Sequence, residues 1–374
     1  MQKDQFENQR LEEAQSTSFM TLSQSYVLEQ FKEDLLPFSY QNTFTSRDVP
    51  ETAPIRQQAS ISAHSVDQDE YLPRRVCTND SALSAEETVL YLAYGSNLAS
   101  ETFLGMRGIK PLSHLNVIVP ELRLTFDLPG IPYIEPCFAG THFRDVPATE
   151  DEETDVLDFS EKHTLLQTLE SDQDHYKGPL IGVVYEVTLS DYAKIIATEG
   201  GGRGYKDIVV TCHPFPNSYS PADPIPERPE TLPLKAHTLL SPAGMHKMLQ
   251  LRTNSKLGFP RNQRYTQPSA RYLNLITTGA EEHDLPLEYR AYLAQIQPYR
   301  ITSMRQRIGM VLFVVMWGPW LLLMLGLSRI CARPDGRIPE WLGGFSDFVK
   351  AGIWITYDKV FVHIFGNGER TVDR

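Results

Sequence analysis

The chain has 374 residues, with 35 basic and 47 acidic side chains and a formal net charge of −12. This balance argues against non-specific binding to nucleic acid, which needs a cationic surface to displace counterions. The four cysteines (Cys77, Cys137, Cys212 and Cys331) form no CxxC pair and no Cys/His cluster, so neither a structural zinc site nor a disulfide framework is indicated. The N-terminus has no apolar run typical of a secretory signal peptide.

Residues 1–87 are rich in Gln, Ser, Glu, Asp and Thr and carry few apolar positions. This composition predicts a disordered N-terminal extension with one short helix around Tyr26–Leu36. A second polar stretch surrounds the acidic run Glu150–Asp155, and it predicts a solvated insertion near residues 145–178.

Short apolar runs between residues 88 and 300 predict strands at 89–94, 116–119, 123–126, 181–187, 207–212 and 236–240. The third of these is expected to end at Leu128-Pro-Gly130. Helical spacing of apolar residues predicts helices at 190–197, 271–282 and 287–295. Residues 213–233 contain seven prolines and predict a long excursion. Many short strands with few helices favour an α+β domain built on a closed or highly curved sheet.

Ile308–Leu327 is an apolar run of about 20 residues without a charge. A helix of this length spans about 30 Å, the thickness of a bilayer core. The run therefore predicts a C-terminal transmembrane helix, and a buried core helix is the alternative. Pro319 would kink such a helix or turn it into a re-entrant hairpin. Arginines flank the run on both sides and do not settle its orientation.

The last segment, residues 328–374, places aromatic side chains at near-helical intervals: Trp341, Phe345, Phe348, Trp354, Tyr357, Phe361 and Phe365. This pattern predicts an amphipathic C-terminal tail. Such a tail could lie at a membrane interface or pack against the rest of the protein, and the sequence does not decide between the two.

Tyr94-Gly-Ser-Asn-Leu98 follows directly on the first predicted strand. A tight turn there would present backbone N–H groups, a hydroxyl and an amide at the strand end. Such a turn suits a carboxylate or a developing oxyanion. A plain strand-to-helix turn is an equally good interpretation of the string alone.

Glu199 ends a predicted helix and enters the glycine-rich run 200–204. The run is not a phosphate-binding loop, because no Lys-Ser/Thr pair follows it and no strand precedes it in the required pattern. A lone glutamate there is usually solvated. The polar run Glu281-Glu-His-Asp284 is likewise interpreted as a solvated helix end and not as a set of metal ligands. No metal or other cofactor is expected.

Together these motifs resemble the γ-glutamylcyclotransferase family over roughly residues 88–300. The matching pieces, in chain order, are Tyr94–Leu98, Glu199–Gly200, Tyr272, and Gly279-Ala280 with Leu285–Tyr289. Members from filamentous-fungal secondary metabolism, which have long extra termini, look most similar. The resemblance implies a small β-barrel flanked by helices as the catalytic domain, here with the two insertions near 145–178 and 213–233.

The resemblance also implies a reaction. The α-amine of a γ-glutamyl compound attacks its own γ-carbonyl, which gives 5-oxoproline and releases an amine. Glu199 is the implied general acid/base. The implied substrate-binding residues are Tyr94, Gly95, Ser96, Asn97, Leu98 and Tyr272. Backbone N–H groups of Gly95–Leu98 would stabilise the oxyanion, Ser96 and Asn97 would hold the α-carboxylate and amine, and Tyr272 would close the pocket. Asn97 stands where glutathione-specific relatives have Leu, which favours γ-glutamyl amino acids or conjugates.

The sequence thus predicts a single-pass membrane protein with a cytosolic lyase domain, tethered through Ile308–Leu327. Two other hypotheses stay open at this point. One is a non-catalytic, membrane-tethered binding module on the same fold. The other is an unrelated membrane-associated adaptor whose motif matches are coincidental. Burial of Glu199 against the Tyr94–Leu98 turn would distinguish the enzyme from the adaptor.

Overall fold

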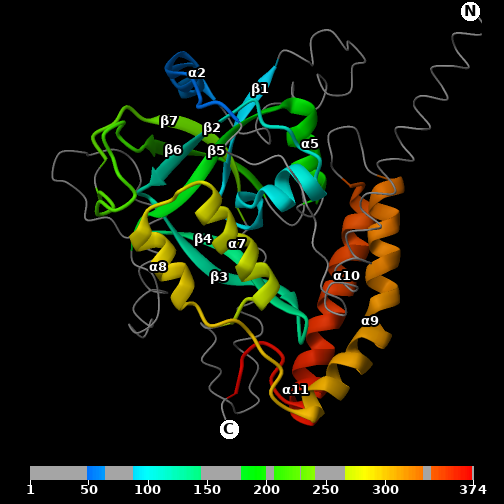
Figure 1. The fold of residues 1–374 in the computed structure, drawn as a ribbon. Coiled ribbons are helices and arrows are strands. Elements are labelled where there is room, and N and C mark those ends of the chain that lie inside the picture. The colour runs from blue at the N-terminus through cyan, green and yellow to red at the C-terminus, as the bar shows by residue number, and fades with distance from the viewer. Residues whose placement is uncertain are drawn as a thin grey trace, which may run out of the picture.

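The computed structural model describes residues 49–63, 87–144, 178–198, 206–227, 229–240, 266–331 and 338–372. The expected helix around Tyr26–Leu36 and the insertion at 145–177 lie outside them. The described chain is a mixed α/β structure with a strand-rich body and a long helical pair beside it (Figure 1). This confirms the predicted α+β class.

Five strands form the body, and the sheet closes on itself as a barrel in the order β1-β5-β2-β6-β7. Their pairing is antiparallel except where β7 returns to β1, at a parallel bridge between Tyr91 and His237. Fully buried aliphatic side chains from these strands fill the core, which is the main source of stability. The strands are β1 (Thr88–Ala93), β2 (Ser113–Val119), β5 (Leu180–Thr188), β6 (Lys206–Pro214) and β7 (Leu234–Leu240).

A separate two-stranded sheet pairs β3 (Leu122–Ile131) with β4 (Glu135–Phe143). The structure differs here from the sequence-based expectation, because β3 continues through Leu128-Pro-Gly130. A Cβ on Gly130 would lie 2.0 Å from the Glu135 carbonyl oxygen, so glycine lets the two strands approach where turn residues suggested an end. β4, with its Pro and Gly, gave no strand signal in the sequence.

The three predicted helices are confirmed as α5 (Leu189–Thr198), α7 (Ala270–Glu282) and α8 (Leu287–Gln295). The proline-rich excursion after β6 packs against the start of α8, where Leu287 N–H donates to the Pro221 carbonyl at 2.8 Å. Phe215 and Ile225 of this excursion pack against the barrel core. The excursion is therefore a folded part of the body.

Residues 49–63, which we call the N-terminal strap, are also ordered against the barrel, although the composition of 1–87 predicts disorder at these positions. The strap contains α2 (Pro54–Ala59) and the short 3₁₀ helix η2 (Ser60–Ser62). Its backbone pairs with β2, where Thr52 N–H donates to the His114 carbonyl at 3.0 Å. Pro at the start of α2 presets helical φ, a local signal that a composition-based reading overlooks.

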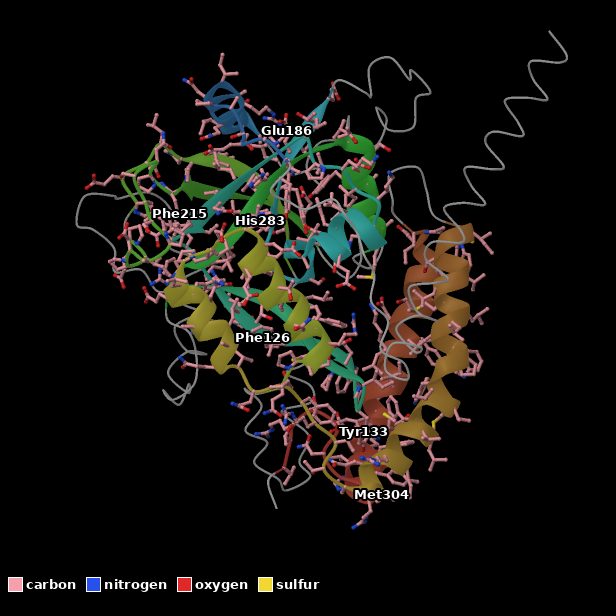
Figure 2. The ribbon with its side chains drawn as sticks, in the orientation of Figure 1. Phe126, Tyr133, Glu186, Phe215, His283 and Met304 are labelled. Carbon is pink, nitrogen blue, oxygen red and sulfur yellow. The ribbon has the colours of Figure 1, made fainter. Side chains whose placement is uncertain are left out.

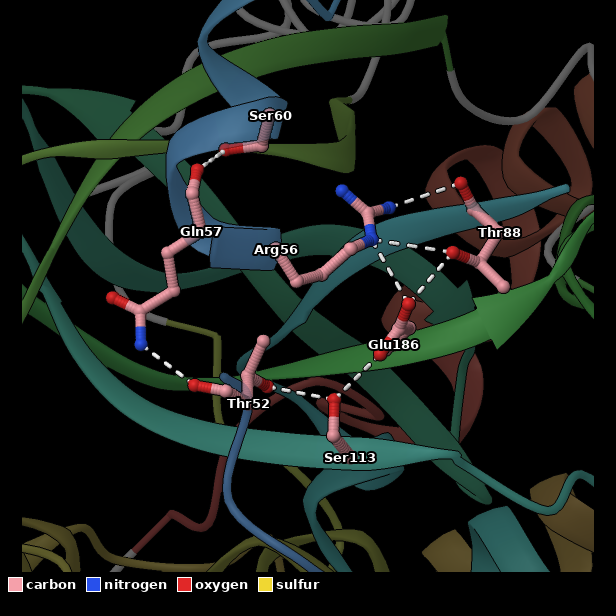
Figure 3. A network of polar contacts seen from close by, with 7 residues as sticks. All are labelled: Thr52, Arg56, Gln57, Ser60, Thr88, Ser113 and Glu186. Carbon is pink, nitrogen blue, oxygen red and sulfur yellow. Dashed lines mark hydrogen bonds and ion pairs between the residues drawn. The ribbon is translucent and has the colours of Figure 1, made fainter. Parts of the chain in front are cut away.

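A polar network fastens the strap to three strands (Figure 3). Arg56 Nε lies 2.9 Å from Glu186 Oε1, while Thr88 and Ser113 donate to the same carboxylate at 2.7 and 2.8 Å. Burial alone would raise the pKa of Glu186. The hydrogen bonds from Thr88, Ser113 and Arg56 outweigh that effect and lower it. The carboxylate is therefore ionised and stabilises the docked strap.

The C-terminal part is a helical hairpin. α9 (Met304–Ile330) starts at a capping box formed by Ser303 and Gln306 and continues through Pro319. α10 (Glu340–Thr356), the π-helical turn η5 (Tyr357–Phe361) and α11 (Val362–Phe365) then run back beside it (Figure 1). Glycines allow the close contact: a Cβ on Gly352 would lie 2.4 Å from the Trp317 ring.

The base of this hairpin is joined to the body through Tyr133, at the turn between β3 and β4. Its ring contacts Phe313 and Tyr357 at centroid distances of 6.0 and 5.7 Å, close to the start of α9 (Figure 2). Tyr133 N–H also donates to the Gly368 carbonyl at 2.8 Å, and Gln267 N–H donates to the Glu369 carbonyl at 3.0 Å.

Residues 366–372, which follow α11 and which we call the C-terminal tail from here on, therefore lie on the body, on the same side as the start of α9. A single-pass topology would place the tail across a membrane from the body. In the structure α10 runs back beside α9 and brings residues 366–372 to the body. Crossing of a membrane by Ile308–Leu327 stays a prediction.

Candidate functional site

The Tyr94–Leu98 turn leaves the barrel at the end of β1. Gly95 has extended backbone angles (φ −107, ψ −141), and Ser96–Leu98 form the 3₁₀ turn η3. Leu98 N–H donates to the Gly95 carbonyl at 3.0 Å, so this N–H is engaged within the turn itself. Gly95 and Ser96 are half-buried at its start, and their backbone N–H groups remain the candidates for oxyanion stabilisation.

Two side chains of the turn face the protein interior. The Tyr94 hydroxyl donates to the Leu239 carbonyl on β7 at 3.2 Å. The Asn97 side chain is buried and donates to the Tyr91 hydroxyl on β1 at 2.8 Å. Both contacts fix the turn to the barrel. The expectation that the Asn97 amide grips the substrate stays a prediction, and its contact with Tyr91 favours a positioning role.

Helix α7 packs directly on this turn. A Cβ on Gly279 would lie 2.4 Å from the Leu98 carbonyl carbon and 2.5 Å from the Ala99 nitrogen, so only glycine permits the observed approach. Two helical turns earlier, the Tyr272 hydroxyl accepts a hydrogen bond from Ala139 N–H at 3.1 Å. The same hydroxyl would lie 3.1 Å from a Cβ placed on Gly95. The structure thus brings Tyr272 and the turn together, as expected.

The start of α7 is held by β4. Ser269 caps the helix by accepting from Tyr272 N–H at 3.0 Å, and it donates in turn to the Glu135 carboxylate. The other oxygen of Glu135 accepts from Arg271 at 2.6 Å. Glu135 is buried. This buried carboxylate therefore fixes Ser269 and Arg271, which both come just before Tyr272.

A buried aromatic pair supports the other end of the turn. Tyr185 Oη lies 2.6 Å from His283 Nε2 and 3.5 Å from the Leu98 carbonyl oxygen. His283 is only 5% exposed, so the expectation of a solvated Glu281–Asp284 run is wrong at this position. Burial, with the nearby His114, lowers the pKa of His283 to about 3. The imidazole is therefore neutral at physiological pH and acts as a packing and hydrogen-bonding group.

Glu199 lies outside the described residues, but both flanks of the run 199–205 are described. Thr198, the last residue of α5, accepts a hydrogen bond from Arg107. Tyr192 on α5 donates to Asp207 on β6, whose carboxylate lies 3.1 Å from His237 Nδ1.

These three buried side chains tie the helix that ends before Glu199 to the strand that begins after residue 205. The Tyr192 ring lies 6.0 Å from that of Tyr91, the partner of Asn97. The flanks are therefore anchored close to the residues that hold the turn.

Sequence reasoning missed several residues that shape this site: Phe138 and Ala139 on β4, Glu135, Tyr185 and His283. Phe138 packs edge-on against Tyr272, with ring centroids 5.1 Å apart. No motif marks these positions, and β4 itself gave no strand pattern. β5 is buried at six consecutive positions, Leu180–Tyr185, so no alternation in the sequence indicates which way Tyr185 points or what it contacts.

The chain is similar to several known proteins. The chain is 32% identical over 283 residues to "Gamma-glutamyl cyclotransferase gliK" of Aspergillus fumigatus, which covers 75% of this chain and 89% of that protein. It is 33% identical over 290 residues to "Gamma-glutamyl cyclotransferase aclK" of Aspergillus oryzae, with 76% and 91% coverage. A solved structure named "Gamma-glutamyl cyclotransferase" matches at 20% identity and a TM-score of 0.35, over 58% of this chain and 92% of the other.

A separate family model, the AclK C-terminal domain, matches residues 303–364, which are α9 to α11. The body and the helical hairpin are thus each similar to parts of known fungal proteins. By its fold the protein is an α+β barrel with a Tyr-Gly-Ser-Asn turn at the end of its first strand. The identity and coverage of the two Aspergillus matches show its family: the chain belongs to the gamma-glutamyl cyclotransferase family.

Proposed function

We propose that this protein is a γ-glutamyl cyclotransferase that converts a γ-glutamyl amino acid or conjugate into 5-oxoproline and a free amine. The observation that carries the proposal is the direct packing of α7, with Tyr272, against the Tyr94–Leu98 turn in a chain of this family. This packing places a phenol hydroxyl beside backbone N–H groups at the end of a rigid strand.

The reaction needs a proton carrier, an oxyanion site and a folded substrate chain. The α-amine nitrogen forms a bond to the γ-carbonyl carbon while it loses a proton to the Glu199 carboxylate. The carbonyl electrons move onto the oxygen and are stabilised by the N–H groups of Gly95 and Ser96. The tetrahedral intermediate then breaks its bond to the leaving nitrogen, which receives the proton from Glu199. No covalent enzyme intermediate is required, because the attack is intramolecular.

The roles of the other residues follow from their contacts. Tyr272 closes one side of the site next to Gly95, and the Ser96 hydroxyl binds the α-carboxylate or amine of the substrate. Tyr94 and Asn97 hold the turn in place through Leu239 and Tyr91. Asp207, Tyr192 and His237 anchor the flanks of the run that carries Glu199.

Incubation of the full chain with a panel of γ-glutamyl amino acids, amines and glutathione tests this proposal. We expect 5-oxoproline from at least one member of the panel, and γ-glutamyl amino acids or conjugates to exceed glutathione. Binding measured by calorimetry without any product would instead support a non-catalytic binding module on the same fold.

We further propose that the protein contacts a membrane through Ile308–Leu327. Among the described residues, α9 is the one helix long and apolar enough to cross a bilayer, and only 17% of its most apolar window is buried. A core helix of a soluble protein would be mostly covered. The low burial therefore supports lipid contact and argues against the alternative of a buried core helix.

A further inference from the structure

One face of α9 is apolar and exposed over the whole length of the helix. Its members are Ile308, Val311, Leu312, Val315, Met316, Trp320, Leu322 and Leu323, each at least 44% exposed. These positions recur at helical spacing and so lie on one side. We call this set the outer face of α9.

The opposite side of α9 is the packed one. Phe313 is 1% exposed and belongs to a cluster with Tyr133, Tyr357 and Phe361, and Trp317 rests on Gly352 of α10. α10 lies between α9 and the barrel (Figure 1). The outer face of α9 therefore points away from the body as an exposed apolar surface, and a large exposed apolar surface marks a site of interaction.

The charges of α10 decide how this surface can meet lipid. Asp347 is exposed and Lys350 half-buried, both near the middle of α10. If the hairpin crossed the bilayer upright, these two groups, which interact with each other, would lie near its centre, where charged side chains are costly. If α9 alone crossed the bilayer, α10 could not pack beside it and the tail could not bind Tyr133 and Gln267 on the body. A helix that lies along the membrane surface keeps both contacts and leaves the charges of α10 outside the bilayer centre.

Cations gather where the hairpin joins the body. Arg305 and Arg307 at the start of α9 and Lys359 in the neighbouring η5 are all exposed, in a chain whose net charge is −12. Basic side chains at the edge of an apolar helical face complement anionic lipid headgroups. A protein partner with both polar and apolar surface would not require basic side chains next to an apolar helical face.

We propose that α9 docks lengthwise on a lipid bilayer through its outer face, with Arg305, Arg307 and Lys359 at anionic headgroups and both the barrel and the C-terminal tail on the same side. The anchor is thus monotopic, and α10 separates the inserted face from the body. This inference rests on the membrane contact proposed above, but it does not depend on the proposed reaction.

Vesicle flotation of the full chain tests the docking. We expect the protein to float with phosphatidylcholine vesicles that contain phosphatidylserine, and to float less with phosphatidylcholine alone. Val315→Glu on the outer face should reduce the bound fraction at least about tenfold, because an exposed aliphatic side chain that would enter lipid is replaced by a charge. Leu232→Glu is the matched control, since Leu232 is 87% exposed on the proline-rich excursion, and it should bind like the unmodified chain.

Failure of the unmodified chain to float would overturn the proposal, as would equal flotation of the Val315→Glu variant. A dimer in solution that Val315→Glu dissociates, without vesicle binding, would show that a second copy covers this face and would also overturn it. Release of 5-oxoproline from a soluble substrate is measured in parallel. Loss of turnover with intact flotation refutes the reaction and leaves the docking standing.

Thiol labelling tests the topology. One cysteine at a time is placed at Val372, which is 51% exposed in the tail, or at Leu232 in the body, with Cys77 and Cys331 replaced by serine and the buried Cys137 and Cys212 kept. The full chain is synthesised with microsomes and treated with a membrane-impermeant maleimide. We expect the two positions to behave alike, both reacting or both protected. Reaction at one position only would show that the chain crosses the membrane an odd number of times between them.

Discussion

Gly279 carries the contact between α7 and the Tyr94–Leu98 turn, so Gly279→Ala should separate them. The added Cβ would lie 2.4 Å from the Leu98 carbonyl carbon and 2.5 Å from the Ala99 nitrogen. Unbonded carbons prefer about 3.5–4.0 Å, so α7 and the turn must move apart by about 1 Å. Such overpacking costs about 1–3 kcal/mol, partly offset by about 1 kcal/mol of better helix propensity for alanine.

The larger effect falls on activity. Tyr272 lies two helical turns before Gly279, so a shift of α7 moves its hydroxyl away from Gly95. A misplacement of about 1 Å at a reacting site can reduce the rate by up to about 100-fold. We therefore expect kcat/KM for 5-oxoproline release to fall about 10- to 100-fold, while urea denaturation shows a loss of up to about 2 kcal/mol.

Gly344→Ala provides the control, because nothing lies within 4 Å of a Cβ added to this helical glycine in α10. That variant should keep full activity and gain up to about 1 kcal/mol from helix propensity. If Gly279→Ala behaved like Gly344→Ala, with unchanged kcat/KM and unchanged stability, the assigned role of the α7–turn contact would be refuted.

Three further predictions concern single side chains. Glu199→Gln should abolish 5-oxoproline release without changing the circular dichroism spectrum or melting temperature, because an amide cannot carry the proton. Arg56→Ala should lower the free energy of unfolding by about 1–3 kcal/mol, since it removes a donor from the largely buried Glu186 carboxylate. His283→Asn should flatten the loss of stability as pH falls below about 6.5, because the native imidazole, with a pKa of about 3, resists a proton that the unfolded chain accepts.

Each of these has its own control. Glu281→Gln, at an exposed glutamate, should leave turnover unchanged, and equal turnover in the Glu199 variant would disprove its role. Lys194→Ala removes a more exposed ion pair with Asp191 and should cost under about 1 kcal/mol, so an equal cost for Arg56→Ala would contradict the strap assignment. Identical pH slopes for the unmodified chain and the His283 variant would contradict the lowered pKa.

Acidification also acts on Glu186, with a definite sign. Its pKa is lowered in the native state, so the stabilisation is present above the ordinary glutamate pKa and is lost as pH falls through the native value. The strap should therefore detach in acid. The Arg56 variant should lose less stability over the same pH range, which thermal melts at several pH values would detect.

Local pattern was enough to predict most of the body. Apolar runs gave the barrel strands, and helix spacing gave α5, α7 and α8 almost to the residue. Strands such as β1 and β5 are predictable because they are short apolar runs buried at nearly every position, and α5 and α7 because each buries one face at helical spacing. β4 was not predictable, since its Pro and Gly interrupt the pattern and its pairing with β3 depends on a close approach at Gly130.

The site was predictable only where a motif existed. The Tyr94–Leu98 turn and Tyr272 were found from the string of family-like residues, and the structure explains Gly279 as the point where helix and turn touch. Glu135 and Tyr185 could not be found, because their partners Arg271 and His283 are about 100 residues away in sequence or more. Such contacts arise from tertiary packing and leave no local pattern.

The C-terminal region shows the same limit. The sequence correctly marked a long apolar helix, but not that α10 packs beside it through Gly352 and returns the tail to Tyr133. Small residues at a helix contact give no signal unless the partner helix is known. The predicted apolar helix is present as α9, and its crossing of a membrane stays a prediction.

Product analysis of one γ-glutamyl substrate tests the central claim most directly. The full chain is incubated with a γ-glutamyl amino acid, and 5-oxoproline, free amino acid and glutamate are measured together over time. Intramolecular cyclisation predicts that 5-oxoproline and the released amino acid appear in equal amounts, with no glutamate. Formation of glutamate in place of 5-oxoproline would show that water attacks the carbonyl, and would contradict the proposed reaction.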